Sequence, residues 1–411
     1  MSFEWREISL GEFVTLQRGH DLPDQARRPG TVPILGSFGI TGYHDTIKAT
    51  GPGVTIGRSG ASFGVAAYID RDYWPLNTAL YVTDFMGNDP RFVFYFFKQF
   101  NFSGYNSGSA QPSLNRNNLY GVPIVVPIPS VQRLIADFLR LIDDRITLLR
   151  ETNATLEAIA QAFFKSWFVD FDPVHAKQEG RIPEGMDEAT AALFPDSFEE
   201  SELGLVPKGW KIGVLSDFAV LNPESWTAKK HPEILAYIDL ANAKDNEIST
   251  ITEYSFEDAP SRARRILKDG DTIVGTVRPG NRSFAYICNL PENLTGSTGF
   301  AVLRPKQPRD AELLYLAATR ESSIEHLAHV ADGAAYPSVR PEVVLGINCI
   351  ISSATVLDLF HDVVSNLLIA VAENQKQAQT LATIRDTLLP RLISGKLRLP
   401  EAEAEAEAMA S

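Results

Sequence analysis

Cysteine and long apolar runs are scarce in this chain, and both shortages exclude classes of protein. Only two cysteines occur among 411 residues, Cys288 and Cys349, and neither belongs to a Cys-x-x-Cys pair. The sequence therefore argues against a structural zinc site and against a disulfide scaffold. The first residues lack the basic and apolar regions of a signal peptide, and no uninterrupted apolar run approaches about 18 residues. We expect a cytoplasmic protein with no membrane partner.

The loops that DNA-modifying and DNA-cleaving enzymes require are also missing. The nearest match to the Asp-Pro-Pro-aromatic loop of an amino-methyltransferase is Asp89–Phe92, which has no second proline, and no Phe-x-Gly-x-Gly turn is present to hold S-adenosylmethionine. Pro23-Asp24 lacks the acidic-x-Lys partner with which a nuclease holds magnesium. A surface helix explains the two histidines of Glu325–His329, so we predict neither a catalytic residue nor a metal site.

The net charge of −13 is concentrated in two segments. Residues 170–203 contain ten acidic and two basic residues, and the Glu-Ala alternation of residues 401–408 contributes four more carboxylates. The remainder of the chain is therefore close to neutral and can present local basic patches to phosphates. We interpret the final acidic segment as a solvated, disordered tail.

A degenerate internal repeat is the most informative feature that is present. Gly108–Leu114 and Gly333–Val339 share a Gly-x-x-x-Pro-Ser pattern, in which Pro337 follows Pro112 by 225 positions. Upstream, residues 53–60 resemble residues 271–280. A repeat of this length indicates two copies of a domain, because the units of a solenoid run about 20 to 50 residues. Two similar recognition modules in one chain suit a target with two parts.

Each half is expected to form a strand-rich module followed by one long helix, which is an α+β pattern. The predicted strands are residues 53–56, 65–69, 80–82, 122–126, 271–277, 284–288, 300–303 and 347–351, and the predicted short helices are residues 91–97 and 311–319.

Apolar residues repeating every seven positions predict that the two long helices form a coiled coil. Ser130 and Thr355 stand where their N-caps are expected. Each helix has a single counterpart in the chain, so we expect the two to pair antiparallel, which gives the molecule a pseudo-two-fold repeat. The expected core of the pair is Ile135, Ile142, Leu149, Asn153, Leu156, Leu367, Val371, Asn374, Leu381 and Leu388.

Antiparallel pairing brings Asn153 and Asn374 near each other at the centre of the helix pair. A buried amide pair there would fix the register at some cost in stability. The alternative is that both asparagines are tolerated at the edge of the seam.

Polar loops recur at matching places in the two halves. Gln and Asn side chains can pair with adenine edges and Arg with guanine, while Ser and Arg also contact phosphates. The alternative is that these loops are turns with solvated tips. The candidate DNA contacts are Arg58, Ser59, Ser109, Gln111, Ser113, Asn115, Arg116, Arg278, Asn281, Arg282, Tyr336, Ser338 and Arg340.

Further motifs accompany the paired Gly-x-x-x-Pro-Ser segments. They are the strand-Pro-x-Pro run Val122–Pro129, the helix end Ala162–Pro173, the segment Leu205–Trp210 and the closing segment Leu388–Leu397. In this combination the chain resembles the specificity subunit of a type I restriction-modification system, over nearly its whole length. It departs from that pattern at Ile351–Val356, where a proline-rich entry to the second helix is usual.

The resemblance implies two target-recognition domains that each read one half of an asymmetric, interrupted site in double-stranded DNA. It also implies that two modification (methyltransferase) subunits carrying S-adenosylmethionine dock on the helices. Restriction subunits that use ATP and Mg then join them, and this chain holds no cofactor itself. One alternative stays open, a coiled-coil scaffold that does not read DNA. The missing loops exclude a self-sufficient modification enzyme, unless its methylase domain is another polypeptide.

These features divide the chain into six segments. They are target-recognition domain 1 (1–129), spacer helix 1 (130–170), an acidic linker (171–207), target-recognition domain 2 (208–353), spacer helix 2 (354–397) and the acidic tail (398–411).

Overall fold

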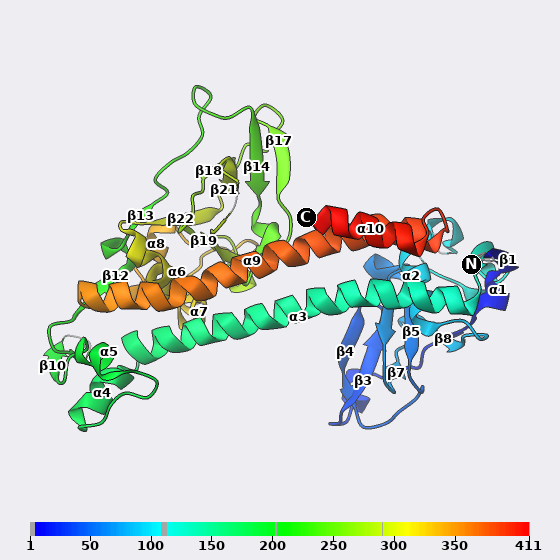
Figure 1. Cartoon of the computed structure of the whole chain (residues 1–411), viewed down its shortest axis with the longest axis horizontal. Coiled ribbons are helices and arrows are strands. Elements are labelled where there is room, and N and C mark those ends of the chain that lie inside the picture. Colours follow the sequence, from blue (N-terminus) through cyan, green and yellow to red (C-terminus); the bar gives the residue numbers. More distant parts are fainter. Residues whose placement is uncertain (1–4, 108–112, 202–203, 290, 411) are drawn as a thin grey trace. The chain divides into compact units, whose positions relative to one another are not determined.

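The computed structural model describes residues 5–107, 113–201, 204–289 and 291–410. The chain forms two compact units, residues 1–148 with 378–411 and residues 149–377. Each unit contains one strand-rich module and part of each long helix (Figure 1). The predicted α+β class is confirmed.

The first module is built on an antiparallel sheet of order β2-β8-β5-β6. A smaller sheet of order β4-β3-β7 contains a parallel β3–β7 pair, and β1 pairs antiparallel with β9. The strands are β1 Trp5–Ser9, β2 Thr15–Arg18, β3 Val32–Gly36, β4 Gly39–His44, β5 Gly53–Gly57, β6 Ala66–Ile69, β7 Trp74–Pro75, β8 Ala79–Asp84 and β9 Pro123–Pro127; the helices are α1 Leu10–Phe13 and α2 Pro90–Gln99.

The second module repeats this plan with a sheet of order β13-β22-β19-β20, a sheet of order β17-β14-β21-β18 and the pair β12–β23. Its strands are β12 Lys211–Val214, β13 Ala219–Leu221, β14 Ile234–Ile238, β15 Ala243–Lys244, β16 Glu247–Ile248, β17 Thr252–Ser255, β18 Ala263–Ile266, β19 Thr272–Gly275, β20 Phe284–Tyr286, β21 Leu294–Ser297, β22 Phe300–Pro305 and β23 Asn348–Ile351; its helices are α6 Ala311–Thr319, α7 Glu321–His329 and α8 Pro341–Leu345.

The internal repeat is preserved in the topology and in single hydrogen bonds. The parallel pair β3–β7 corresponds to the parallel pair β14–β21 in the second module. After β5 the N–H of Gly57 donates to the Val65 carbonyl at 2.8 Å, and after β19 the N–H of Gly275 donates to the Ser283 carbonyl at 2.7 Å. The second module adds strand β18, the hairpin β15–β16 and helix α7. The predicted strands and short helices are all found, with ends shifted by at most two residues.

The long helices are α3 Pro129–Phe168 and α9 Ala354–Ile393, and they lie side by side (Figure 1). In the second unit the Asn374 amide donates to Asn153 Oδ1 at 2.9 Å, and Asn153 Nδ2 donates to the Val371 carbonyl at 3.1 Å. In the first unit Arg385 Nη1 lies 2.7 Å from Asp143 Oδ1. Partner numbers fall on α9 as they rise on α3, so the predicted antiparallel pairing and the amide contact are both confirmed.

Half of the predicted core of the helix pair is buried, namely Ile135, Ile142, Leu149, Val371 and Leu388. Leu156, Leu367 and Leu381 are half-buried, as are the two asparagines. A second set of seam positions is fully buried instead, because the modules pack against the helices as well; this set is Leu139, Ala160, Val364 and Leu392.

The helix starts differ from those predicted by one or two residues. Helix α3 begins at Pro129, and proline suits a first turn because its missing N–H has no partner there anyway. At the start of α9 the Ser353 hydroxyl accepts the Val356 N–H at 3.3 Å, so Ser353 is the cap and not Thr355. The cap lies earlier because the helix already includes Ala354.

Helix α9 is long and apolar enough to cross a membrane by length and composition alone. Its apolar side chains Val356, Phe360 and Val364 are fully buried in the protein core. Aromatic packing against α3 adds to this, since the rings of Phe360 and Phe168 lie 4.9 Å apart. These contacts account for the apolar residues on one face of the helix.

The segment expected as an acidic linker contains regular secondary structure. It contains α4 Asp172–Gln178, α5 Glu188–Ala192 and the hairpin of β10 Phe198–Ser201 with β11 Gly204–Pro207. Val174 and Phe194 are buried, and the Phe194 ring packs edge-on against Trp167 at 5.0 Å. The linker is therefore anchored by apolar contacts to the end of α3.

The prediction of a disordered acidic tail is wrong, because helix α10 spans Leu399–Ala410. Ala and Glu both favour helix, and Ala402 is fully buried. Arg391 of α9 binds Glu405 through both carboxylate oxygens, with Nη2 2.9 Å from Oε1. Composition pointed to solvation, but these two tertiary contacts order the segment.

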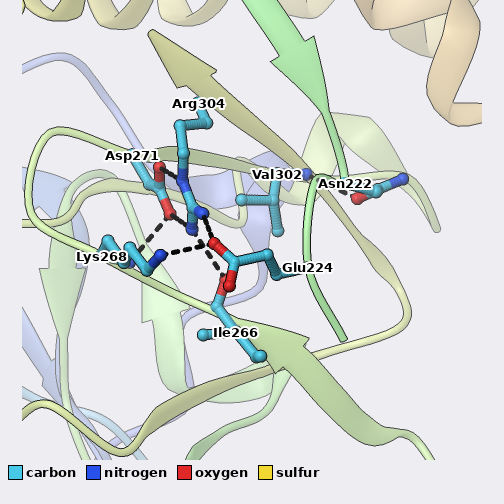
Figure 2. A network of polar contacts seen from close by, with 7 residues as sticks. All are labelled: Asn222, Glu224, Ile266, Lys268, Asp271, Val302 and Arg304. Atoms are coloured by element: carbon cyan, nitrogen blue, oxygen red, sulfur yellow. Dashed lines mark hydrogen bonds and ion pairs between the residues drawn. The ribbon is translucent and has the colours of Figure 1, made fainter. Parts of the chain in front are cut away.

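A network of charged side chains ties strand β22 to the loops around it in the second module (Figure 2). Arg304 donates through Nε and Nη2 to the two carboxylate oxygens of Asp271, each at 2.8 Å, and it also pairs with Glu224. Lys268 bonds Glu224 from the other side. Asp271 is fully buried, and this burial raises its pKa while the Arg304 guanidinium opposes the rise.

Replacing Arg304 by methionine should destabilise the second module by about 3–5 kcal/mol at neutral pH, because it leaves the Asp271 carboxylate buried without a counter-ion. With Arg304 gone, burial raises the Asp271 pKa in the folded state above the unfolded value of about 3.9. The loss should therefore shrink as the pH falls towards that value, since the folded carboxyl takes up a proton first. Urea unfolding of the variant and wild type at pH 7 and pH 5 measures this.

The matched control is the double variant Arg304→Met with Asp271→Asn. The difference in free energy of unfolding between the double variant and the single variant Arg304→Met should vanish at low pH. An R304M deficit that stays constant with pH would contradict a dominant role for Asp271.

Replacing Asn153 alone by leucine should cost about 1 kcal/mol, because the Asn374 amide loses its acceptor. The double variant Asn153→Leu with Asn374→Leu removes both amides and should recover that loss. The denaturant midpoints of both variants distinguish an amide pair that fixes the register from two asparagines that are only tolerated at the seam. Equal stability of the single variant and the wild type would mean that the asparagines are only tolerated at the seam.

Candidate nucleic-acid interface

In the first module the turn after β5 and the loop that carries the Pro-Ser motif are joined. Ser59 and Ser113 form an antiparallel bridge, and the Leu114 N–H donates to the Arg58 carbonyl at 2.8 Å. Arg58 Nη1 also donates to the Asn77 carbonyl at 3.2 Å. The structure therefore brings the neighbouring candidates Arg58 and Ser59 together with Ser113, which lies more than fifty positions later in the sequence.

The second module joins its turn and loop in the same way. Val277 and Ser338 form an antiparallel bridge, and the Val339 N–H donates to the Thr276 carbonyl at 2.9 Å. The turn that follows, η7 Pro279–Asn281, corresponds to η2 Gly60–Ser62 of the first module. Each module thus presents one turn-and-loop face, defined as residues 58–62 with 113–116 in the first module and residues 277–282 with 335–340 in the second.

Several of the predicted DNA-contact residues instead form hydrogen bonds or ion pairs within the protein, which stabilise these faces. Arg116 Nη1 donates to the Leu16 carbonyl of β2 at 3.1 Å, and Asn115 Oδ1 accepts the Asn117 N–H at 3.0 Å. Arg282 pairs with Asp245 and Glu321. The predictions for Ser109 and Gln111 lie outside the described residues.

Other predicted residues are exposed on the second face. Tyr336 is 71% exposed, and Asn281, Ser338 and Arg340 are also exposed. Arg278 is exposed too, with its guanidinium carbon 4.7 Å from the centroid of the Tyr336 ring.

Positive charge near the first face comes partly from residues that were not predicted. Burial and, to a smaller extent, the charge of Arg18 lower the pKa of Arg58. Arg18 is itself paired with Asp21, with its Nη2 3.6 Å from Oδ1. The sequence signal for Arg18 was weak, because it lies at the end of a short strand, β2, that the alternation pattern did not reveal.

A dibasic pair precedes the same strand in both modules and was also missed. Arg27-Arg28 ends four positions before β3, and Lys229-Lys230 ends four positions before β14. Arg28 is paired with Asp45, whereas Lys229 and Lys230 are exposed. The equal spacing before repeat-related strands is the signal that could have found them.

Within the described ranges no group of three or more His, Cys, Asp or Glu side chains is arranged to hold a metal ion. The histidines His326 and His329 both lie on α7.

Comparison with known proteins relates this chain to one family. Residues 3–158 match the family model described as the type I restriction modification DNA specificity domain. By this match and by the relatives below, the chain is similar to the specificity subunits of type I restriction-modification systems. Such subunits are non-catalytic components of their complexes, and their task is recognition of the DNA target.

Two curated relatives are similar over most of the chain. The MjaIX specificity subunit of Methanocaldococcus jannaschii is 25% identical over 320 residues, which cover 75% of this chain and 69% of the relative. The HindI specificity subunit of Haemophilus influenzae is 24% identical over 331 residues, which cover 70% and 71%. The crystal structure of a type I S subunit from M. genitalium has a TM-score of 0.58 at 15% identity and covers 95% of this chain and 96% of that one, so it supports the fold.

Proposed function

We propose that this chain acts as a specificity subunit and reads an asymmetric two-part site in double-stranded DNA, with one module for each half. The observation that carries the proposal is the repeated turn-and-loop face, which has the same main-chain bridge in both modules. The bridge fixes the backbone without using side chains. Side chains at its tip are therefore free to differ between the modules and to meet different base sequences.

The side chains of the two faces do differ. Where the first module has Ser59 in the bridge the second has Val277, and the exposed stack of Arg278 on Tyr336 belongs to the second face. Serine hydroxyls and arginine guanidinium groups present different donors to base edges in the major groove. Two unlike faces on one frame fit a target whose halves have unlike sequences.

Exchanging residues 10–122 for the same segment of another family member should change one half of the methylated sequence and leave the other half intact. These junctions are favourable because they keep the native β1–β9 pair, and the Leu10 N–H donates to the Val122 carbonyl at 2.9 Å. The measurement is methylation-sensitive sequencing of DNA from cells that carry the complete system.

The reciprocal exchange of residues 215–347 is the matched control and should change only the other half. An unaltered site, or a change in both halves after either exchange, would contradict the modular reading.

The second part of the proposal is that modification subunits, two per chain, dock on the long helices. Leu134 and Leu141 of α3 are 50% and 69% exposed and lie one heptad apart on its outer side, followed by Leu148 at 51%. A pocket beside Leu134 is lined by the apolar residues Trp5, Val131, Ile135, Leu397 and Leu399, together with Gly395 and Arg398. A helix of a partner fits such a stripe, because apolar residues every seven positions pack as a further coiled-coil seam.

S-adenosylmethionine, ATP and Mg are assigned in this proposal to the modification and restriction subunits. The resemblance to type I systems supports the assignment, and restriction subunits would join after the modification subunits have docked.

Replacing Leu141 by glutamate should weaken co-purification with the modification subunit by more than about tenfold, because it places a charge within an apolar interface. The fold should be unaffected, since Leu141 is 69% exposed. Leu205→Glu is the matched control, because Leu205 is an exposed leucine of the β11 hairpin, 63% accessible, outside the helix pair. Undiminished binding by L141E, or an equal loss in L205E, would show that this stripe is not the docking surface.

A further inference from the structure

We infer that Arg278 reads a guanine in the half of the target recognised by the second module, and that Tyr336 orients its guanidinium for this task. The inference rests on the proposed function, because it takes the turn-and-loop face of the second module as the one that meets DNA. Its main support is the stack of the Arg278 guanidinium over the Tyr336 ring, 4.7 Å from the ring centroid.

The guanidinium of Arg278 is held in place from one side only. Its Nη2 donates to the Ala335 carbonyl at 2.8 Å, and its main-chain N–H donates to the Pro337 carbonyl at 2.6 Å. Both the arginine and Tyr336 are exposed. Within the part of the chain that the structure describes, Arg278 has no carboxylate partner, so its remaining N–H groups are available to a ligand.

The backbone of Arg278 supports a role beyond turn formation. Its φ of +48° lies in the left-handed region, which costs a side-chain-bearing residue energy unless other contacts hold it there. Glycine would satisfy the turn without that cost. An arginine in this conformation projects a long side chain from the tip of the face.

Arg282 closes the same turn and provides the contrast. It too has a positive φ, +61°, but its guanidinium is engaged by both Asp245 and Glu321. The carboxylates occupy the donors of Arg282 and neutralise its charge. Of the two turn arginines, Arg278 is therefore the one equipped to bind an acceptor on DNA.

Guanine is the base that fits these donors best. Its major-groove edge offers two acceptors, N7 and O6, at the spacing of two guanidinium N–H groups, whereas adenine offers an N–H2 donor in place of O6. Stacking on Tyr336 reduces the rotamer freedom that Arg278 would lose on binding, which favours a directed base contact. A phosphate offers acceptors as well, but a phosphate contact would not distinguish one base pair from another.

The test uses the complete modification complex with wild-type or variant subunit. Methylation rates are measured on the target duplex and on duplexes in which each G:C pair of the second half is replaced in turn. For Arg278→Lys, which keeps the charge but loses the planar fork, discrimination at one G:C position should fall by about 10- to 100-fold. The other positions, including the whole first half, should be read as in the wild type.

Two variants of the platform extend the test. Tyr336→Phe retains the ring and should read the same position as the wild type does. Tyr336→Leu removes the ring and should lose part of the discrimination at the position affected by R278K.

Arg282→Lys is the matched control from the same turn. It should lower the thermal unfolding temperature of the subunit, because the geometry of two ion pairs is disturbed, and leave discrimination unchanged. R278K should show the opposite pattern, with normal unfolding and altered discrimination.

Three results would overturn the assignment of Arg278. They are a second half-site without a G:C pair, unchanged discrimination in R278K, and a uniform loss of affinity across all sequences in Arg278→Ala with a shallower salt dependence, which identifies a phosphate contact. Failure of the proposed function is separate, since the wild-type complex would then show no dependence on the second half at all.

Discussion

The antiparallel packing of α3 against α9 is the constraint on which the rest of the structure depends. The first compact unit is not continuous in sequence, because residues 378–411 of the chain complete it, and the second, residues 149–377, includes the end of α3 and the start of α9. Each module therefore buries its helix-facing side only when both helices are present. The Asn153–Asn374 amide pair and the Asp143–Arg385 ion pair specify the same register, since a slip of one turn would leave all four side chains without partners.

Repeat-related tyrosines attach the modules to this helix pair. Tyr95 of α2 donates to Asp143 at 2.6 Å, and Tyr315 of α6 donates to Glu157 at 2.9 Å, and both carboxylates belong to α3. Asp143 is balanced by an arginine of α9, whereas Glu157 is largely buried and receives an Asn246 amide, so burial raises the pKa of Glu157. The duplication kept the tyrosine and changed its partners. The two attachment sites have diverged as the turn-and-loop faces have.

The sequence predicted the elements whose signal is local. The heptads of α3 and α9 and the β-branched runs of β5 and β22 were recognisable from periodicity. Strands β3 and β4 were missed because Pro33, Gly39 and Gly42 interrupt their alternation. The tail helix was missed because its acidic composition was interpreted as disorder although Ala and Glu favour helix, and because the sequence does not reveal the contact between Arg391 and Glu405.

The candidate site shows the same limit. The internal repeat predicted both turn-and-loop faces. It did not distinguish candidate residues that bond to other parts of the protein from candidate residues that are exposed. Arg116 bonds a carbonyl 100 positions away and Arg282 a carboxylate 37 positions away, and such partners are set by the tertiary fold.

In each turn-and-loop face, main-chain hydrogen bonds fix the backbone, and the exposed side chains take no part in them. This explains how one fold can serve two different half-sites. The bonds from Leu114 to Arg58 and from Val339 to Thr276 join main-chain atoms, so a substitution at either tip removes none of them. A new residue at such a position has a conformational free-energy cost of its own, about 1–3 kcal/mol where the backbone is left-handed. The second module offsets this cost locally, through the Tyr336 ring beneath Arg278 and the two carboxylates around Arg282. Recognition side chains can therefore change with their immediate supports while the sheets and the helix pair stay as they are.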